Sequence, residues 1–151
     1  MRVSFDLNLR LENWGWEGDF RAVAETAIAR SDIVLGAASD EVAALAGIDD
    51  PVEAAMSLAG DGRVVIARLG AGGAVACSDA GVVTVPGFEV EVLDTVGAGD
   101  AFDAGFIAAQ LRSPDVTEGL RWGNAVAALA ISRPGARSTP TLQEVQALLA
   151  E

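Results

Sequence analysis

Hydrophobic and polar residues in this chain follow two periods, one typical of strands and one of helices. Residues 2–7 alternate apolar and polar side chains, which predicts a half-buried strand. Residues 19–30 repeat apolar positions every three or four residues, which predicts an amphipathic helix. Short apolar runs at 33–35 and 63–69 predict buried strands. Strands that alternate with helices are typical of a mostly parallel α/β sheet.

Turn-forming residues separate the remaining predicted elements. The strand pattern of 74–78 and 82–85, broken at 79–81, predicts a β-hairpin. Trp14 and Trp16 are expected in a loop. A further strand is expected at 90–93, and helices at 40–46, 51–58, 101–111, 115–132 and 141–150. The predicted fold class is therefore α/β, a three-layer α/β/α arrangement whose mostly parallel sheet has an antiparallel hairpin edge.

Length and composition limit what the protein can be. A chain of 151 residues, about half of them apolar, is long enough for one domain with a core. No apolar run approaches the ~18 residues that span a membrane, and residues 2–10 do not resemble a signal peptide. The single cysteine, Cys77, has no partner for an internal disulfide and is expected in the core. We expect a cytoplasmic protein.

Charge and residue types exclude several functions. The formal net charge of −12 argues against nucleic acid or an anionic membrane as the partner. A chain without histidine has no His-based catalytic triad, and carboxylates remain as the acid–base groups. Any nucleotide site in so acidic a chain must be made locally positive by amides, a cation or an arginine.

The glycine-rich stretch after residue 93 carries the clearest chemical signal. Gly97 and Gly99 allow a tight turn directly before a predicted helix. Backbone amides of residues 96–100 would point out of the helix start, where the helix dipole favours an anion such as phosphate. Asp100 would lie among them as a proton acceptor. The same pattern is also compatible with an ordinary turn and an N-cap.

Residues 94–102, DTVGAGDAF, resemble the signature D-T-x-G-A-G-D-x-F of the ribokinase-like (PfkB) carbohydrate kinases. The resemblance implies an ATP-dependent phosphotransferase that uses Mg²⁺ and acts on a hydroxyl of a sugar or sugar acid. It implies that Gly97, Ala98 and Gly99 form the anion hole and that Asp100 is the general base.

Two other stretches resemble parts of the same family. Residues 4–10 are similar to the F-D-P-N-x-R segment of 2-keto-3-deoxygluconate kinases and fructokinase-like members, with Leu7 in place of proline. This implies that Asn8 and Arg10 bind the substrate; the alternative is a surface arginine. Glu41 matches the glutamate of the family's N-x-x-E motif, whose asparagine is replaced by Ala38. That glutamate would organise water around Mg²⁺, and a solvated helix-start glutamate is the alternative.

The resemblance also extends to the nucleotide and to a monovalent cation. Residues 68–73 are similar to the family's K-x-G-x-x-G turn, although a strand followed by a hairpin turn also explains the glycines. The implied nucleotide-binding residues are Arg68, Gly70, Gly73, Thr95 and Asn124. The implied ligands of a K⁺-like ion, several of them through backbone carbonyls, are Asp94, Val96, Ala130, Arg133, Gly135 and Thr139.

The resemblance covers nearly the whole chain but only the second half of the family's usual length. We therefore expect residues 1–151 to form a single ribokinase-like C-terminal, nucleotide-binding domain without the N-terminal half and the sugar lid. Whether this chain is active alone is open. One alternative is a non-catalytic pseudokinase that binds nucleotide. Another is a half-protein that forms a homo-oligomer, or pairs with a complementary chain, through an exposed N-terminal strand.

Overall fold

The computed structural model describes residues 1–10, 13, 15 and 18–150. The chain divides into two compact units, one of residues 1–68 and 76–82 and the other of residues 69–75 and 83–151. The predicted loop positions Trp14 and Trp16 lie outside the described residues. None of the described helices combines the length and the apolarity that a bilayer-spanning helix needs.

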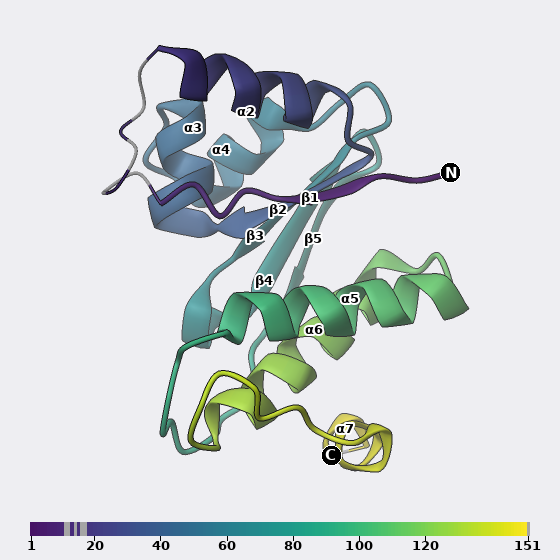
Figure 1. The fold of residues 1–151 in the computed structure, drawn as a ribbon. Helices are drawn as coiled ribbons and strands as arrows, with labels where there is room; N and C mark the ends of the chain where they lie inside the picture. Colours follow the sequence, from purple (N-terminus) through teal and green to yellow (C-terminus); the bar gives the residue numbers. More distant parts are fainter. Residues whose placement is uncertain (11–12, 14, 16–17, 151) are drawn as a thin grey trace. The chain divides into compact units, whose positions relative to one another are not determined.

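Five strands form one sheet in the order β1-β2-β3-β4-β5 (Figure 1). β1 pairs parallel with β2, and β2 pairs parallel with β3, with Phe5 opposite Val34 and Val34 opposite Val65. A two-residue turn joins β4 to its neighbour β5, so the predicted hairpin is present at one edge of the sheet. The strands are Ser4–Asp6 (β1), Ile33–Ala37 (β2), Val64–Arg68 (β3), Ala74–Ser78 (β4) and Gly81–Val85 (β5).

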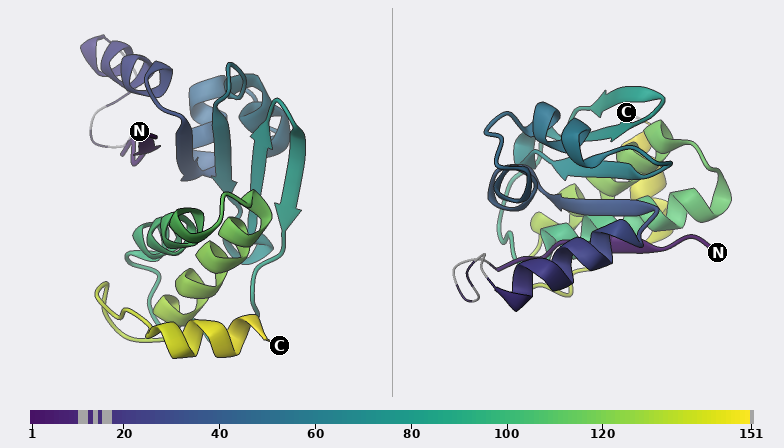
Figure 2. Two further views of the ribbon diagram at one scale, coloured as in Figure 1. Left: turned by 90° about the vertical axis from the view of Figure 1, so that its right-hand side faces the viewer. Right: turned by 90° about the horizontal axis from the view of Figure 1, so that it is seen from above.

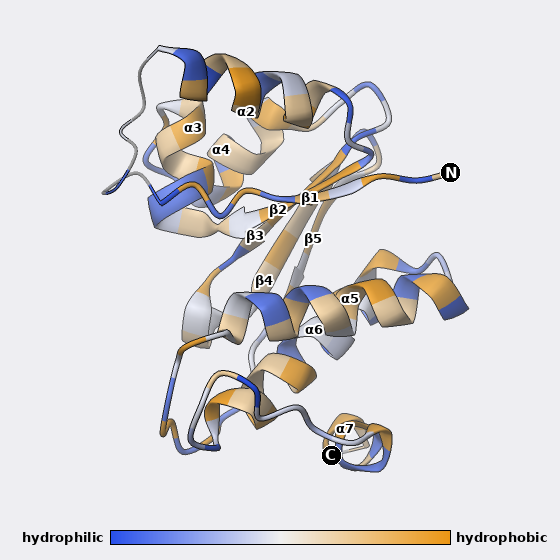
Figure 3. Cartoon of the chain, viewed as in Figure 1, coloured by the Kyte–Doolittle hydropathy of each residue, from blue (hydrophilic) through white to orange (hydrophobic). Residues whose placement is uncertain are grey.

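The first unit has its core along β2 and β3, which Figure 3 draws mainly in the hydrophobic colour. Helix α4 (Pro51–Leu58) contacts β3 and buries Ala54 and Ala55 completely. Its ends follow local chemistry, because the Asp50 carboxylate caps the first turn and a proline occupies the first helical position. The other helical segments of this unit are α2 (Asp19–Ala29), the π-helix η1 (Ala38–Ala43) and α3 (Ala44–Ala46).

The second unit is built on three helices, α5 (Ala98–Arg112), α6 (Val116–Ile131) and α7 (Leu142–Leu149), with a short 3₁₀ turn η2 (Gly70–Gly72). α5 and α6 lie side by side in Figure 2 and contact each other extensively. Their close approach depends on Gly105, Gly119 and Gly123, where a Cβ would lie 2.7 Å from an atom of the facing helix. The Phe102 and Phe106 rings stack with centroids 6.4 Å apart and lie at this contact.

Three element predictions were wrong in detail, and the first is the helix expected at 101–111, which begins three residues earlier, at Ala98. Residues 90–93 are not a strand: the segment forms no sheet pairing, and Val92 and Leu93 are more than half exposed. The amides of Leu93 and Asp94 instead donate to the carbonyl oxygen of Ile131, at the end of α6. The helix expected at 40–46 begins earlier, at Ala38, with π-helical turns.

Candidate functional site

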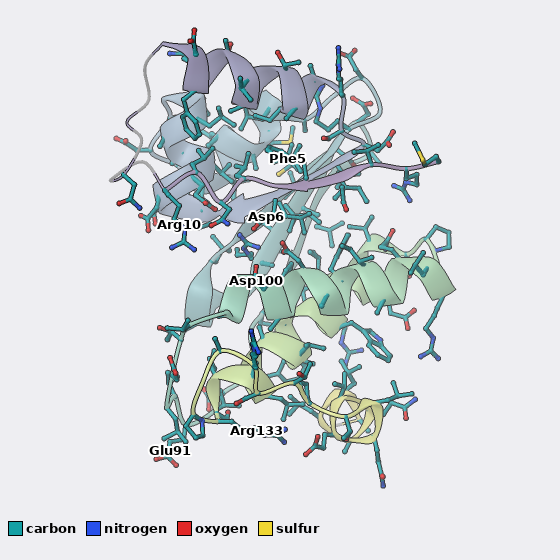
Figure 4. All side chains as sticks on the ribbon, viewed as in Figure 1. Phe5, Asp6, Arg10, Glu91, Asp100 and Arg133 are labelled. Atoms are coloured by element: carbon teal, nitrogen blue, oxygen red, sulfur yellow. The ribbon has the colours of Figure 1, made fainter. Side chains whose placement is uncertain are left out.

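The turn before α5 requires glycine at one position for two reasons. Gly97 is the N-cap residue of α5 and has φ 82°, in the left-handed region. A Cβ at this position would also lie 2.9 Å from the carbonyl oxygen of Ala136. Asp100 lies in the first turn of this 15-residue helix and is exposed, so its carboxylate is not turned into the core (Figure 4).

The amides at this turn are only partly available for an anion. The Val96 amide donates to Oδ1 of Asp94 at 3.0 Å, and the Ala98 amide donates to the Thr95 carbonyl at 3.2 Å. Within the described part of the chain, no group accepts a hydrogen bond from the amide of Gly97 or Asp100. The free donors are therefore fewer than the five that the sequence suggested, and they lie directly beside the Asp100 carboxylate.

Asp94 connects this turn to the segment after α6. Its Oδ2 accepts a hydrogen bond from the Gly135 amide at 3.0 Å, while its Oδ1 accepts the Val96 amide. The structure therefore brings together three of the residues that the resemblance assigns to a monovalent cation. The Ala130 carbonyl accepts the amides of Ser132 and Arg133, whereas the Gly135 carbonyl accepts only the Ser138 amide among the described residues, so the Gly135 oxygen keeps a lone pair that fits a cation.

Two other members of the predicted cation set have side chains engaged elsewhere. The Arg133 guanidinium pairs with Glu144 at 2.5 Å, and the Thr139 hydroxyl donates to the Arg137 carbonyl at 3.2 Å. The Thr141 amide, followed by the Arg133 side chain, lowers the pKa of Glu144 to about 2. Arg133 can therefore contribute to a cation only through its backbone carbonyl, whereas the Thr139 hydroxyl oxygen, which here acts as a donor, keeps its lone pairs.

A second cluster lies at the carboxyl ends of the parallel strands of the first unit. Nη2 of Arg68 lies 2.8 Å from Oδ1 of Asp6 and 3.5 Å from Oε2 of Glu41. The side chains of Arg68 and Glu41 are only 14% and 13% exposed. Glu41 is therefore not the solvated helix-start glutamate that the sequence left as an alternative.

The predicted substrate residues Asn8 and Arg10 follow β1 and are exposed; Figure 4 labels Arg10. Both have positive φ, 38° at Asn8 and 50° at Arg10, which is uncommon for residues with a Cβ. Nε of Arg10 donates to Oδ1 of Asn8 at 2.9 Å, so the two side chains lie together.

Two of the other predicted nucleotide residues have structural roles of their own. Gly73 lies where a Cβ would be 2.1 Å from the Val85 carbonyl oxygen, so packing alone requires glycine there. Asn124 is buried, and its Nδ2 donates to the carbonyls of Val85 and Pro86 at 3.2 and 3.0 Å. Gly70 (φ 60°) and Thr95 are exposed.

Sequence reasoning missed Asp6 as the partner of Arg68 and missed the two backbone amides that Glu41 accepts. The Leu9 amide donates to Oε1 of Glu41 at 2.8 Å, and the Ala37 amide to Oε2 at 2.6 Å. The available signal was positional: Asp6, Ala37 and Arg68 end three neighbouring parallel strands. Side chains at one edge of such a sheet meet.

Comparisons with known proteins agree with this architecture. Residues 1–142 match the pfkB family carbohydrate kinase. The chain is 44% identical over 149 residues to an ATP-dependent ribose-1-phosphate kinase of Halopiger xanaduensis, covering 99% of this chain and 46% of that protein. A putative ribokinase II of E. coli in complex with ATP and Mg²⁺ is similar with TM-score 0.85 and 28% identity, covering 99% of this chain and 48% of that one.

A third similarity concerns a structure with a sugar. Fructokinase of Vibrio cholerae, bound to fructose, ADP and calcium, has TM-score 0.84 and 29% identity, covering 98% of this chain and 50% of that one. The chain thus spans about half the length of the relatives it matches. These similarities confirm the predicted ribokinase-like α/β fold, and the chain belongs to the pfkB family of carbohydrate kinases.

Proposed function

We propose that this chain carries the phosphate site and the general base of an ATP-dependent kinase that phosphorylates a hydroxyl group of a sugar or sugar acid. The observation that carries the proposal is the turn at the start of α5, where the amides of Gly97 and Asp100 have no acceptor among the described residues and lie next to the exposed Asp100 carboxylate. An N-terminal helix turn with free amides is a favourable place for phosphate.

In the proposed reaction, Asp100 accepts the proton of the attacking hydroxyl while the hydroxyl oxygen forms a bond to the γ-phosphorus and ADP leaves. The amides of Gly97 and Asp100, together with the helix dipole, stabilise the charge on the transferring phosphoryl group. Ala98 and Gly99 complete the turn, whose small residues allow the phosphate to approach the backbone.

This chain offers more candidate ligands for a K⁺-like ion than for Mg²⁺. The described residues contain no group of three His, Cys, Asp or Glu side chains that could hold a metal ion. Mg²⁺ would therefore bind mainly to the phosphates and water, and it would neutralise charge on the nucleotide. The resemblance assigns Glu41 to its waters; because both of its oxygens accept backbone amides, any such contact would be secondary to that role. A K⁺-like ion would be held by Asp94 with the carbonyls of Val96, Ala130, Arg133 and Gly135, and by Thr139.

Asn8 and Arg10 would bind an anionic group of the sugar, because an exposed guanidinium offers paired donors to a phosphate or carboxylate. A relative whose name specifies a sugar phosphate, the ribose-1-phosphate kinase, supports this assignment. Arg68, Gly70, Gly73, Thr95 and Asn124 remain proposed nucleotide residues.

The test combines calorimetric titration with ATP and a transfer assay on ribose 1-phosphate, fructose and a sugar acid. We expect Asp100→Ala to lower the transfer rate by roughly 10²–10⁴-fold with ATP affinity nearly unchanged. Glu118→Gln, which removes an exposed acid from the first turn of α6, is the matched control and should leave both unchanged. Normal transfer by Asp100→Ala would remove Asp100 from the role of base.

ATP binding without any transfer by the unsubstituted chain would instead favour the non-catalytic alternative, which the comparisons do not support. Association through β1 also stays a prediction. β1 lies at the end of the strand order and pairs with β2 alone among the described strands. Light scattering over a range of concentrations measures whether two copies associate.

A further inference from the structure

We propose that Glu41 is a positioning residue that fixes the loop carrying Asn8 and Arg10 in the conformation that receives the substrate's anionic group. The proposal rests on the proposed function for the identity of that group. It assigns Glu41 a task within the protein that needs no metal ion.

Glu41 connects the ends of all three parallel strands in the first unit. Oε1 accepts the amide of Leu9, in the segment after β1, and Oε2 accepts the amide of Ala37, the last residue of β2. Oε2 also lies 3.5 Å from the guanidinium of Arg68, the last residue of β3. A largely buried carboxylate with donors on both oxygens is held in one orientation.

The loop after β1 needs such an anchor. Leu7 and Leu9 are buried, at 4% and 2% exposure, so Asn8 and Arg10 between and after them face outward. Positive φ at both outward residues is disfavoured, and it persists only where surrounding contacts enforce it. The hydrogen bond from Leu9 to Glu41 lies between the two strained residues, so it is the contact best placed to hold both.

The same geometry limits what else Glu41 can do. An ionised carboxylate offers about four lone-pair positions. Two are used by backbone amides and a third faces Arg68. Most of the acceptor capacity of Glu41 is therefore used inside the protein, whereas the guanidinium of Arg10 is exposed.

The experiment uses the full chain with Glu41→Ala, Glu41→Gln and the control Asp6→Asn. Asp6→Asn removes a negative charge from the same arginine but leaves both amide bonds of Glu41 in place. Hydrogen exchange of the Leu9 amide reports the anchor. Titration with inorganic phosphate in magnesium-free buffer, followed by NMR of the Arg10 Nε–H, reports the loop. Calorimetry with Mg²⁺ and ATP reports the nucleotide site.

For Glu41→Ala we expect faster exchange at Leu9 and a phosphate affinity lower by on the order of tenfold, with Mg·ATP affinity unchanged. Glu41→Gln keeps the shape and one acceptor, so it should fall between Glu41→Ala and the unsubstituted chain, and it replaces Glu41→Ala if that variant does not fold. Asp6→Asn should match the unsubstituted chain in exchange at Leu9. A general loss of stability would lower the affinities for phosphate and for Mg·ATP together, whereas loss of the anchor should lower only the affinity for phosphate.

Unchanged exchange at Leu9 in both Glu41 variants, or a loss of Mg·ATP affinity with phosphate binding intact, would overturn the proposal. Failure of the proposed function looks different. If the unsubstituted chain shows no phosphate response at Arg10, the anionic-substrate assignment is wrong, and exchange at Leu9 alone decides whether Glu41 anchors the loop.

Discussion

Replacing Gly105 by alanine tests whether α5 and α6 approach as closely as the structure shows. Gly105 is buried in the middle of α5. A Cβ there would lie 2.7 Å from the Trp122 carbonyl oxygen and 2.8 Å from Cγ2 of Val126. The valine side chain can adjust, but the carbonyl belongs to the backbone of α6. The helices must therefore separate locally to accept the methyl group.

The expected change in stability is the difference between two opposing contributions. Carbon–oxygen contacts are normally about 3.3–3.6 Å, so the methyl group is too close to the Trp122 oxygen by roughly 0.6 Å. Overpacking of this kind costs about 1–3 kcal/mol. Alanine in place of glycine returns about 0.8–1 kcal/mol through helix propensity. We expect Gly105→Ala to lower the free energy of unfolding by up to roughly 2 kcal/mol, and the thermal midpoint by up to roughly 8 °C.

The assay is urea unfolding followed by circular dichroism, with Ala104→Gly as the matched control. Ala104 is the exposed neighbour in the same helix, so its substitution measures propensity without the helix contact. We expect the control to lose about 1 kcal/mol. If Gly105→Ala gains as much stability as Ala104→Gly loses, no packing penalty exists, and the inferred close approach of α5 and α6 is wrong.

Three further predictions concern the phosphate turn, pH and salt. Gly97→Ala should lower ATP affinity, measured by calorimetry, because φ 82° and the Ala136 carbonyl at 2.9 Å both oppose a Cβ. Unchanged affinity would show that this turn does not bind the nucleotide. Glu144 has its pKa lowered from 4.5 to about 2, so the stability that it contributes is full above pH 4.5 and is lost as pH falls towards 2. In Glu144→Gln the unfolding midpoint should depend less on pH between 4.5 and 2 than in the unsubstituted chain. The same pH dependence in both proteins would contradict the assignment of this stability to Glu144. The net charge of −12 should make the thermal midpoint rise between low salt and about 1 M KCl, and a falling midpoint would show that repulsion is not the dominant effect.

The prediction of helix ends succeeded where a few adjacent residues decide the outcome. The helix expected at 51–58 has the bounds of α4, which begins at Pro51 after the capping Asp50, and the helix expected to end at residue 46 ends there, before Gly47 with φ 68°. The glycine turn at Gly97 was recognisable for the same reason. The family followed from the order of residues 94–102, and the comparisons confirm it.

Local preference was not sufficient where a distant partner decides the conformation. Residues 90–93 have the composition of a strand, yet they pair with none of the described strands, and the amides of Leu93 and Asp94 bond to the end of α6. The Val96 amide was expected to face an anion, but the Asp94 carboxylate accepts it. Both outcomes depend on hydrogen-bond geometry that the order of residues does not specify.

The sequence by itself determined the alternation of strands and helices, the hairpin, the glycine turn with its acid, and the family. Only the tertiary structure decided which amides at that turn stay unpaired, why Gly105 is a glycine, and that Glu41 lies buried between Leu9 and Ala37. The physical reason is range: backbone preferences and caps act within about four residues of the chain. Burial and side-chain pairing, such as the contact between Asp6 and Arg68 across 62 positions, exist only once the strands are packed side by side.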